Sequence, residues 1–220
     1  MNNYFKRIRG ITVEKIKKPK IKVFDIKTIT ECIEEKIFNN IKIISDDRKS
    51  KLENVTFDSC EIYKLDFTKL ESENISLIDC VLKECDFSNL TFEEICFRRC
   101  TLDDCKMVGV NIINCSINDV IFNNCNLKYS NICDTKFNNV SLKNINLSDS
   151  RFIDCTTKKF ILEQCNFSKS EIINCDLNDV NFNDSDISEI SIDYTSLKGI
   201  VVNQFQAVML ASLLGIVIRD

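Results

Sequence analysis

Residues 165–179 read CNFSKSEIINCDLND, and dividing them into fives places Phe167, Ile172 and Leu177 at the same position of each group. Every fifth residue over 52–197 continues this series, and 28 of its 30 members are large and apolar. A helix repeats its apolar residues at three and four, and a half-buried strand repeats them at two. The sequence therefore predicts a five-residue repeat that neither an ordinary helix nor an ordinary strand explains.

A second series of small or medium residues stands two places before the first. Ten of the 13 cysteines belong to this second series, and ten of the 15 phenylalanines belong to the first. The other three positions of each group are mostly Asp, Asn, Ser, Thr, Lys and Glu. Two side chains in five are thus expected to point inward. The expected core includes Phe87, Phe92, Phe97, Phe122, Phe137, Phe152, Phe167, Cys80, Cys100 and Cys125.

The passages CDFSN (85–89), CNLKY (125–129) and INLSD (145–149) resemble the consensus of the pentapeptide-repeat proteins. That consensus is a small residue, Asp or Asn, Leu or Phe, a polar residue and a variable one. The resemblance extends over residues 52–202 without an insertion. It implies an all-β solenoid, a right-handed quadrilateral β-helix in which five residues form each side and 20 form one coil. With coils about 4.8 Å apart, thirty repeats predict a rod of roughly 36 Å.

The interior series has one irregular place. Thr157 is undersized for its position, while Phe160, three residues later, is oversized for its own. Because the two residues fall within one coil, we expect them to share the same interior space.

Residues 1–51 form a basic segment that is expected to cap the rod. They carry a net charge of +7, whereas residues 52–220 carry −11. Isoleucines within 28–43 follow helical spacing with Thr30 as a possible N-cap, but Phe38 and Ile43 could equally open a degenerate coil. In either case the segment is expected to cover the open end of the β-helix. The pattern does not place Cys32, which lies in this segment.

Residues 203–220 follow the repeats and are expected to form a helix and then a short Ile-Val-Ile strand. Gly215 stands where a helix end favours a left-handed residue. The ending LKGIVVNQFQAVMLASLLGIVIRD resembles that of the quinolone-resistance (Qnr-like) branch of the same family, whose C-terminal helix and strand build a homodimer. The expected dimer interface comprises Phe205, Met209, Leu210, Leu213 and Leu214.

The composition argues against catalysis. The chain has no His, which removes the commonest general base and metal ligand. Cysteine pairs such as Cys80 and Cys85 are five residues apart, unlike the two-residue gap of zinc knuckles. Carboxylate pairs such as Asp103 and Asp104 lack a partnering motif. We therefore expect no catalytic residue, no metal and no cofactor, and a protein that is not an enzyme.

Other features bear on the compartment. The chain opens with MNNYFKRIRG, which lacks the apolar core of a signal peptide, and its cysteine number is odd. Apolar runs are shorter than the roughly 18 residues of a membrane span. We expect a cytoplasmic bacterial protein with reduced thiols and no membrane contact. Only Cys96 and Cys133 occupy outward positions in the rod, so we expect their thiols to be the first to react.

The Qnr-like resemblance implies a function. Proteins of that branch are understood as DNA mimics whose acidic rod occupies the DNA-binding surface of DNA gyrase or topoisomerase IV and protects it from quinolones or toxins. A dimer of residues 52–220 would carry −22 over about 72 Å, where duplex DNA carries roughly 42 charges. The unbroken register leaves no room for the projecting loops that Gram-negative members carry. No direct binding of nucleic acid is expected.

Residues 20 apart suggest a contact face as well. Four of them occupy the same outward position on four successive coils, are apolar and lie beside acidic and amide residues. The alternative function is therefore that of a structural or adaptor rod with an unrelated protein partner. The candidate partner face comprises Ile113, Cys133, Ile153, Ile173, Asp134 and Asp154.

Overall fold

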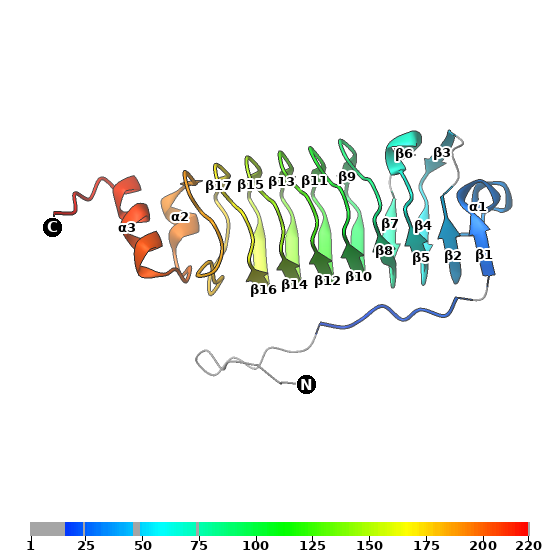
Figure 1. Ribbon diagram of the computed structural model, residues 1–220, viewed down its shortest axis with the longest axis horizontal. Helices are drawn as coiled ribbons and strands as arrows, with labels where there is room; N and C mark the ends of the chain where they lie inside the picture. Colours follow the sequence, from blue (N-terminus) through cyan, green and yellow to red (C-terminus); the bar gives the residue numbers. More distant parts are fainter. Residues whose placement is uncertain (1–15, 24, 46–48, 74, 220) are drawn as a thin grey trace.

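The structure is a computed structural model that describes residues 16–23, 25–45, 49–73 and 75–219. The chain winds into a rod of about eight turns (Figure 1). Residues 1–15 of the expected cap segment and Asp220 of the expected C-terminal segment lie outside the described residues.

Each coil has four sides, which we number in chain order. Sides 1 and 2 belong to one parallel sheet, in which residues 20 apart pair, as Phe97 does with Ile117. The longer strands turn from side 1 to side 2: β10 (Cys96–Asp103), β12 (Ser116–Asn123), β14 (Lys136–Lys143) and β16 (Thr156–Glu163). Shorter strands of this sheet are β1 (Asp25–Thr28), β2 (Ile41–Ile44), β4 (Thr56–Asp58), β5 (Glu61–Tyr63), β7 (Ser76–Ile78) and β8 (Val81–Lys83).

The other two sides differ in their pairing. Side 3 is joined from coil to coil by single bridges, such as those of Lys106 with Asp86 and with Asn126. A short 3-10 helix, η1 (Phe67–Lys69), stands on this side of an early coil. Side 4 carries β3 (Ser50–Glu53), β6 (Leu70–Glu73), β9 (Thr91–Glu93), β11 (Asn111–Ile113), β13 (Asn131–Cys133), β15 (Arg151–Ile153), β17 (Glu171–Ile173) and β18 (Ser191–Ile192).

The corners explain how a chain with four Gly and one Pro turns so often. At most corners between Asn54 and Glu189, the residue two places after the inward apolar side chain has a positive φ, and more than half of these residues are Asn or Asp. Short polar side chains tolerate this left-handed conformation better than branched or bulky ones. The five-residue repeat therefore supplies a suitable turn residue without Gly.

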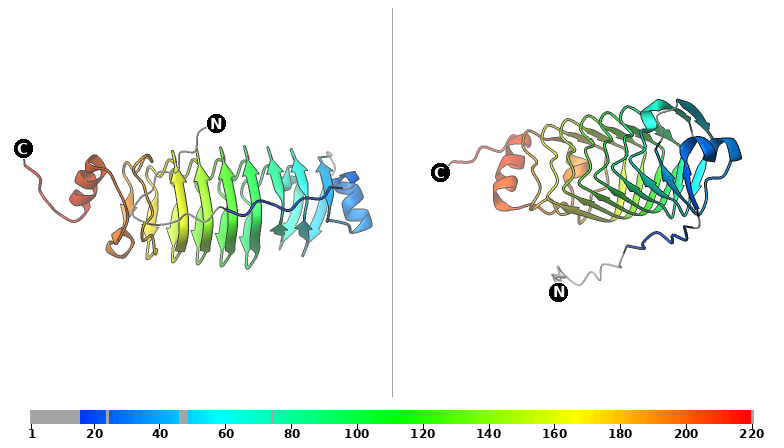
Figure 2. Two further views of the ribbon diagram at one scale, coloured as in Figure 1. Left: turned by 90° about the horizontal axis from the view of Figure 1, so that it is seen from below. Right: turned by 45° about the vertical axis from the view of Figure 1, so that its right-hand side comes forward.

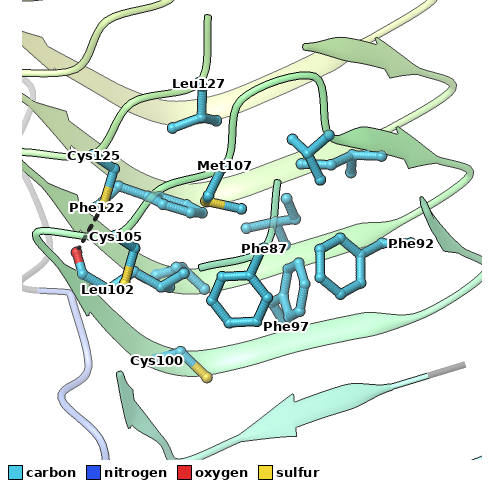
Figure 3. Packing of buried hydrophobic residues seen from close by; sticks show 14 of the residues in the cluster. Phe87, Phe92, Phe97, Cys100, Leu102, Cys105, Met107, Phe122, Cys125 and Leu127 are labelled. Atoms are coloured by element: carbon cyan, nitrogen blue, oxygen red, sulfur yellow. Dashed lines mark hydrogen bonds between the residues drawn. The ribbon is translucent and has the colours of Figure 1, made fainter. Parts of the chain in front are cut away.

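The interior confirms the predicted core. All ten core residues named from the sequence are buried, with exposed fractions of at most 7%. Figure 3 shows the cysteines beside the phenylalanine stack, with the thiol of Cys125 bonded to the Leu102 carbonyl of the previous coil at 3.5 Å. The Cys80 and Cys100 thiols make the equivalent bonds. Interior cysteines thus also satisfy backbone carbonyls between coils.

Thr157 and Phe160 share space as expected. Both line one small cavity of about 10 Å³ inside the rod. The Phe160 ring packs against Phe137 at a centroid distance of 5.1 Å, and the Thr157 hydroxyl donates to the Asp176 carbonyl at 2.8 Å. The larger side chain fills most of the volume that the smaller one leaves.

At the N-terminal end, helix α1 (Ile29–Glu35) covers the first coils (Figure 1). Its N-cap is Thr28, so the prediction of Thr30 was wrong. Thr28 forms a capping box with Glu31, whereas Thr30 faces the core. The helix ends before Ile37, and β2 then opens an early coil in which Ile43 pairs with Ile62. The two alternatives predicted for this segment, a helix and a degenerate coil, are therefore both present, one after the other.

Residues 16–23, which we call the strap, do not cover the end of the rod. They run as an extended segment along its length, across the strands of sides 1 and 2 (Figure 2). The Lys20 amide donates to Asp79 at 3.0 Å and the Lys17 amide to Asp119 at 3.4 Å. The sequence analysis had assigned these residues only to a cap segment.

At the C-terminal end stand two helices, α2 (Tyr194–Leu197) and α3 (Gln204–Leu213). Gly215 has a φ of +74° and closes α3 as expected, with its amide donating to the Ser212 carbonyl. The predicted Ile-Val-Ile strand was wrong, because residues 216–219 have no regular structure. A strand needs a neighbour that supplies its hydrogen bonds, and the described part of this chain places none there.

Candidate interaction surface

Side 4 carries the ridge predicted from the sequence. Ile113 pairs with Cys133, Cys133 with Ile153, and Ile153 with Ile173, so the four side chains stand in a row on β11, β13, β15 and β17. All four are half-buried, because neighbouring coils cover part of each. The structure therefore brings these residues together on one flat side of the rod.

Acidic residues are concentrated on the same side. The segments 90–94, 110–114, 130–134, 150–154, 170–174 and 190–193 contain one cationic residue, Arg151, which binds Glu171 at 2.6 Å. Described ion pairs involve neither Glu93 nor Asp134, both of which are exposed. Side 4 is therefore strongly negative. Its six carboxylates belong to Glu93, Glu94, Asp134, Asp154, Glu171 and Asp193.

Side 1 has the opposite sign over residues 95–159, whereas the same side carries Asp58 and Asp79 in earlier coils and Asp176 and Asp179 in a later one. In the segments 95–99, 115–119, 135–139 and 155–159, Asp119 is the single carboxylate. Adding all charges of the rod together, as the sequence analysis did, hides this separation. Sorting the charged residues by their position in the 20-residue repeat would have revealed it. The five cations of side 1 are Arg98, Arg99, Lys136, Lys158 and Lys159.

Amide side chains hold the acidic corner of side 4 in place. Asn174 donates to the Asp154 carboxylate at 2.5 Å, and the Asn174 backbone amide donates to Asp193 at 3.1 Å. Asn114 reaches Glu94 at 3.5 Å. These bonds between residues on successive coils fix the spacing of the negative charges without neutralising them.

The structure shows the surroundings of the cysteines and carboxylates that the sequence analysis considered for chemistry. Among the described residues, no group of three or more His, Cys, Asp or Glu side chains could hold a metal ion. All thirteen cysteines are free thiols. Burial raises the pKa of the Cys96 and Cys133 thiols, and it raises that of Cys32 to about 11. A thiol with a raised pKa is a weak nucleophile at neutral pH.

The expected dimer residues divide between two surroundings. Leu210 is buried against the last coils of its own chain, and Met209 packs beside it. Phe205, Leu213 and Leu214 are exposed, at 77%, 49% and 53%. Further exposed apolar residues, outside the five named for the interface, are Val208, Ile216, Val217 and Ile218.

Gln206 was missed at the sequence level. Its side chain donates to the carbonyls of Phe182 at 2.9 Å and Ser185 at 2.8 Å. It also completes a capping box with Asn203 at the start of α3. The spacing of Asn203 and Gln206 indicates a capping box, but no sequence pattern indicates that Gln206 also bonds to the carbonyls of Phe182 and Ser185.

No helix in the described part of the chain is long and apolar enough to cross a membrane.

Solved structures similar to this one share low sequence identity with it. QnrB1, described as a plasmid-mediated fluoroquinolone resistance protein, is 18% identical with a TM-score of 0.45, over 89% of this chain and 95% of that one. HetL from Nostoc sp. strain PCC 7120, involved in heterocyst differentiation regulation, is 11% identical with a TM-score of 0.43, over 84% and 93%. A pentapeptide repeat protein from the Arabidopsis thaliana thylakoid lumen is 15% identical with a TM-score of 0.32, over 58% and 71%.

Sequence comparison with curated proteins found no significant match. Two family profiles do match: the pentapeptide repeat region over residues 75–147, and pentapeptide repeats in eight copies over residues 145–184. Together they span half of the chain. Pentapeptide repeats form right-handed quadrilateral β-helices, in agreement with the four sides and 20-residue coils described above. The chain therefore belongs to the pentapeptide-repeat family.

Proposed function

We propose that this protein is a non-enzymatic, cytoplasmic binding rod that mimics DNA and binds DNA gyrase or topoisomerase IV, protecting the enzyme from quinolones or toxins. The observation that supports this most directly is the acidic side 4. Its six carboxylates extend over five coil steps, about 24 Å at 4.8 Å per step. One carboxylate per about 4 Å is close to the 3.4 Å per phosphate of a single DNA strand.

The shape of the rod is compatible with this role. The coils from residue 75 to residue 192 repeat without an inserted loop, so any contact must be made by the sides themselves. Corner residues such as Asp134 and Asp154 are exposed along this side. A cationic surface shaped for DNA can therefore approach the negative charges of this side.

The test is a gyrase supercoiling assay with titrated protein, with and without ciprofloxacin. We expect inhibition or protection that weakens when four side 4 carboxylates are neutralised together. The matched control neutralises four carboxylates on side 2 and should leave the activity unchanged. The side 4 variant carries Glu93→Gln, Glu94→Gln, Asp134→Asn and Asp154→Asn, and the control carries Glu84→Gln, Asp103→Asn, Asp104→Asn and Glu163→Gln.

An absence of both inhibition and protection at a large molar excess contradicts the proposal. Equal loss of activity in the two variants contradicts the assignment to side 4, because it would show that total charge alone determines the effect.

A second candidate function is that of an adaptor rod with an unrelated protein partner. The half-buried ridge of Ile113, Cys133, Ile153 and Ile173 favours it, since apolar residues in a row can mark a contact site. The double variant Ile153→Lys, Ile173→Lys should lose that partner while retaining its fold by circular dichroism. If the folded variant captures the same partner, the ridge is not the contact.

A further inference from the structure

The strap is anchored to the rod through its backbone. Lys20 and Lys17 donate their amides to Asp79 and Asp119, which stand two coils apart on the corner between sides 1 and 2. Three residues of extended chain cover about 10 Å, and two coil steps cover about 9.6 Å. An extended segment therefore crosses the coils in step with their spacing.

The anchoring carboxylates are held in position by other side chains. Asp79 is 6% exposed and accepts hydrogen bonds from the Arg99 guanidinium, whose Nε lies 2.6 Å away. That contact lowers the pKa of Asp79, which stays ionised. Asp119 accepts from Asn139 at 2.5 Å. At the corner between sides 2 and 3, by contrast, the equivalent residue Asp104 is exposed. The strap therefore lies on a defined site.

Because backbone amides contact the carboxylates, most strap lysines keep their charge available. Pro19, Ile21 and Val23 are half-buried against the rod, while the lysines between them face solvent. Described ion pairs of the strap involve Lys17 alone, with Asp119 at 3.9 Å. The exposed lysines outside that pair are Lys18, Lys20 and Lys22.

Side 1 extends this row of positive charge. Arg98, Lys136 and Lys158 are exposed and belong to none of the ion pairs among the described residues. The row ends where residues 175–179 introduce Asp176 and Asp179. Six cations without a paired carboxylate thus stand on the strap and the side that it borders. We call these six residues the basic strip: Lys18, Lys20, Lys22, Arg98, Lys136 and Lys158.

We propose that the basic strip binds the phosphate backbone of duplex DNA. Cations that follow one another along the rod can face successive phosphates of a stiff polyanion, and contacts to phosphate need no base-reading group. The six cations stand on an extended segment and on one side of a sheet, neither of which is a helix that could enter the major groove, so we expect binding that is independent of base sequence. This differs from the expectation of no direct nucleic acid contact that accompanied the DNA-mimic interpretation of the sequence. Local charge controls a contact, because salt screens charges beyond about 8–10 Å.

The test is fluorescence anisotropy of a labelled 20-base-pair duplex with the full-length protein, from 50 to 200 mM salt. We expect micromolar binding at 50 mM and a slope of log K against log salt near −5, because each phosphate contact contributes about −0.9. Lys18→Glu, Lys20→Glu, Lys22→Glu together should weaken binding at least tenfold. The control Lys64→Glu, Lys83→Glu, Lys143→Glu makes the same charge change on side 2 and should alter binding less than twofold.

The variant Asp119→Ala distinguishes an effect of the docked strap on DNA binding from an effect of net charge alone. Removing a carboxylate beneath the strip should strengthen binding about twofold or more if net charge alone matters. If the docked strap is required, loss of the Lys17 anchor weakens binding about threefold. Thermal unfolding by circular dichroism confirms that the variant is folded.

Two outcomes overturn the proposal. These are no anisotropy change at 50 mM salt up to 100 µM protein, and equal loss in the strip and control variants. Tighter binding by Asp119→Ala would support contact with phosphate and overturn the requirement for a docked strap. Salt-sensitive self-association without DNA binding would indicate that the basic strip binds the acidic side 4 of a second copy and not DNA. None of these results depends on the gyrase assay, so this proposal and the proposed function can fail separately.

Discussion

Both ends of the rod must be covered, and α1 covers its end more completely than α3 does. A β-helix leaves its first and last coils with an open apolar interior and unpaired backbone groups. At the N-terminal end, α1 inserts Ile29 and Cys32, both 0% exposed, into the core. At the C-terminal end, α3 inserts Leu210 and Gln206 but leaves Phe205, Val208 and Leu213 in solvent.

The difference shows which end is complete within one chain. A capping element needs a polar outer face, and α1 has one, with Glu31, Glu34 and Glu35 exposed. The outer face of α3 and the segment after it are apolar, and residues 216–218 lack strand partners in the described chain. We therefore propose that a second copy covers the C-terminal end, as the resemblance to Qnr-like proteins implies.

The largest expected effect is on assembly. Leu213→Lys with Val217→Lys should convert a dimer to a monomer, because charge is costly at an apolar interface. Central interface residues contribute about 2 kcal/mol or more each, so the dissociation constant should rise about 1000-fold. Light scattering after size exclusion measures the mass. The control is Ile26→Lys at the N-terminal end, where a 66% exposed residue should have no effect on mass. A wild-type monomer at 100 µM would contradict the dimer.

The next effect concerns the closed end. Ile29→Ala should lower the free energy of unfolding by about 2–5 kcal/mol, because the lost side chain leaves a cavity in the core. Urea denaturation measures this change. Ile26→Ala nearby should change it by less than about 0.5 kcal/mol, since that side chain is exposed. Similar values for both would show that α1 does not cap the core.

Gln206→Leu tests the polar part of the C-terminal cap. The carbonyls of Phe182 and Ser185 would lose their donor, at a cost of about 1–3 kcal/mol in the free energy of unfolding. Exposed Gln204 offers the matched change, Gln204→Leu, which should be nearly neutral. A neutral Gln206→Leu variant would mean that water satisfies these carbonyls in its place.

The smallest expected effect is on the rate of thiol labelling, which we compare between the N-terminal end and the rod. Cys96 and Cys133 should react first with a maleimide, because the other eleven thiols are buried. Their pKa values are raised above the ordinary 9.0, so labelling should accelerate as the pH rises toward and beyond that value. Mass spectrometry of peptides identifies the order. Labelling of Cys32 before Cys133 would show that the N-terminal end opens more readily than proposed.

Much of the fold could be predicted from the sequence because the rod is repetitive. The inward positions of Phe97, Cys100 and their equivalents follow from a period of five, and the structure buries them as expected. Local errors arose at the ends, where the repeat stops. Thr28 and Thr30 are both reasonable N-caps by residue type, and only the bond to Glu31 distinguishes them.

The candidate surface was predicted in part. The ridge of Ile113 to Ile173 was visible at a spacing of 20, whereas the separation of acidic side 4 from basic side 1 was hidden in the total charge. Both patterns are present in the sequence. The second requires that every charged residue be assigned to its side before the charges are added.

By itself, the sequence determined the coil, its core and its corners, because each depends on side chains a few residues apart and on the repeat that stacks them. The tertiary structure alone decided where the strap lies. Its anchors join Lys20 to Asp79 and Lys17 to Asp119, which are 59 and 102 residues apart. No local pattern encodes such contacts, since they depend on the corner residues of separate coils being brought into one line by the completed rod.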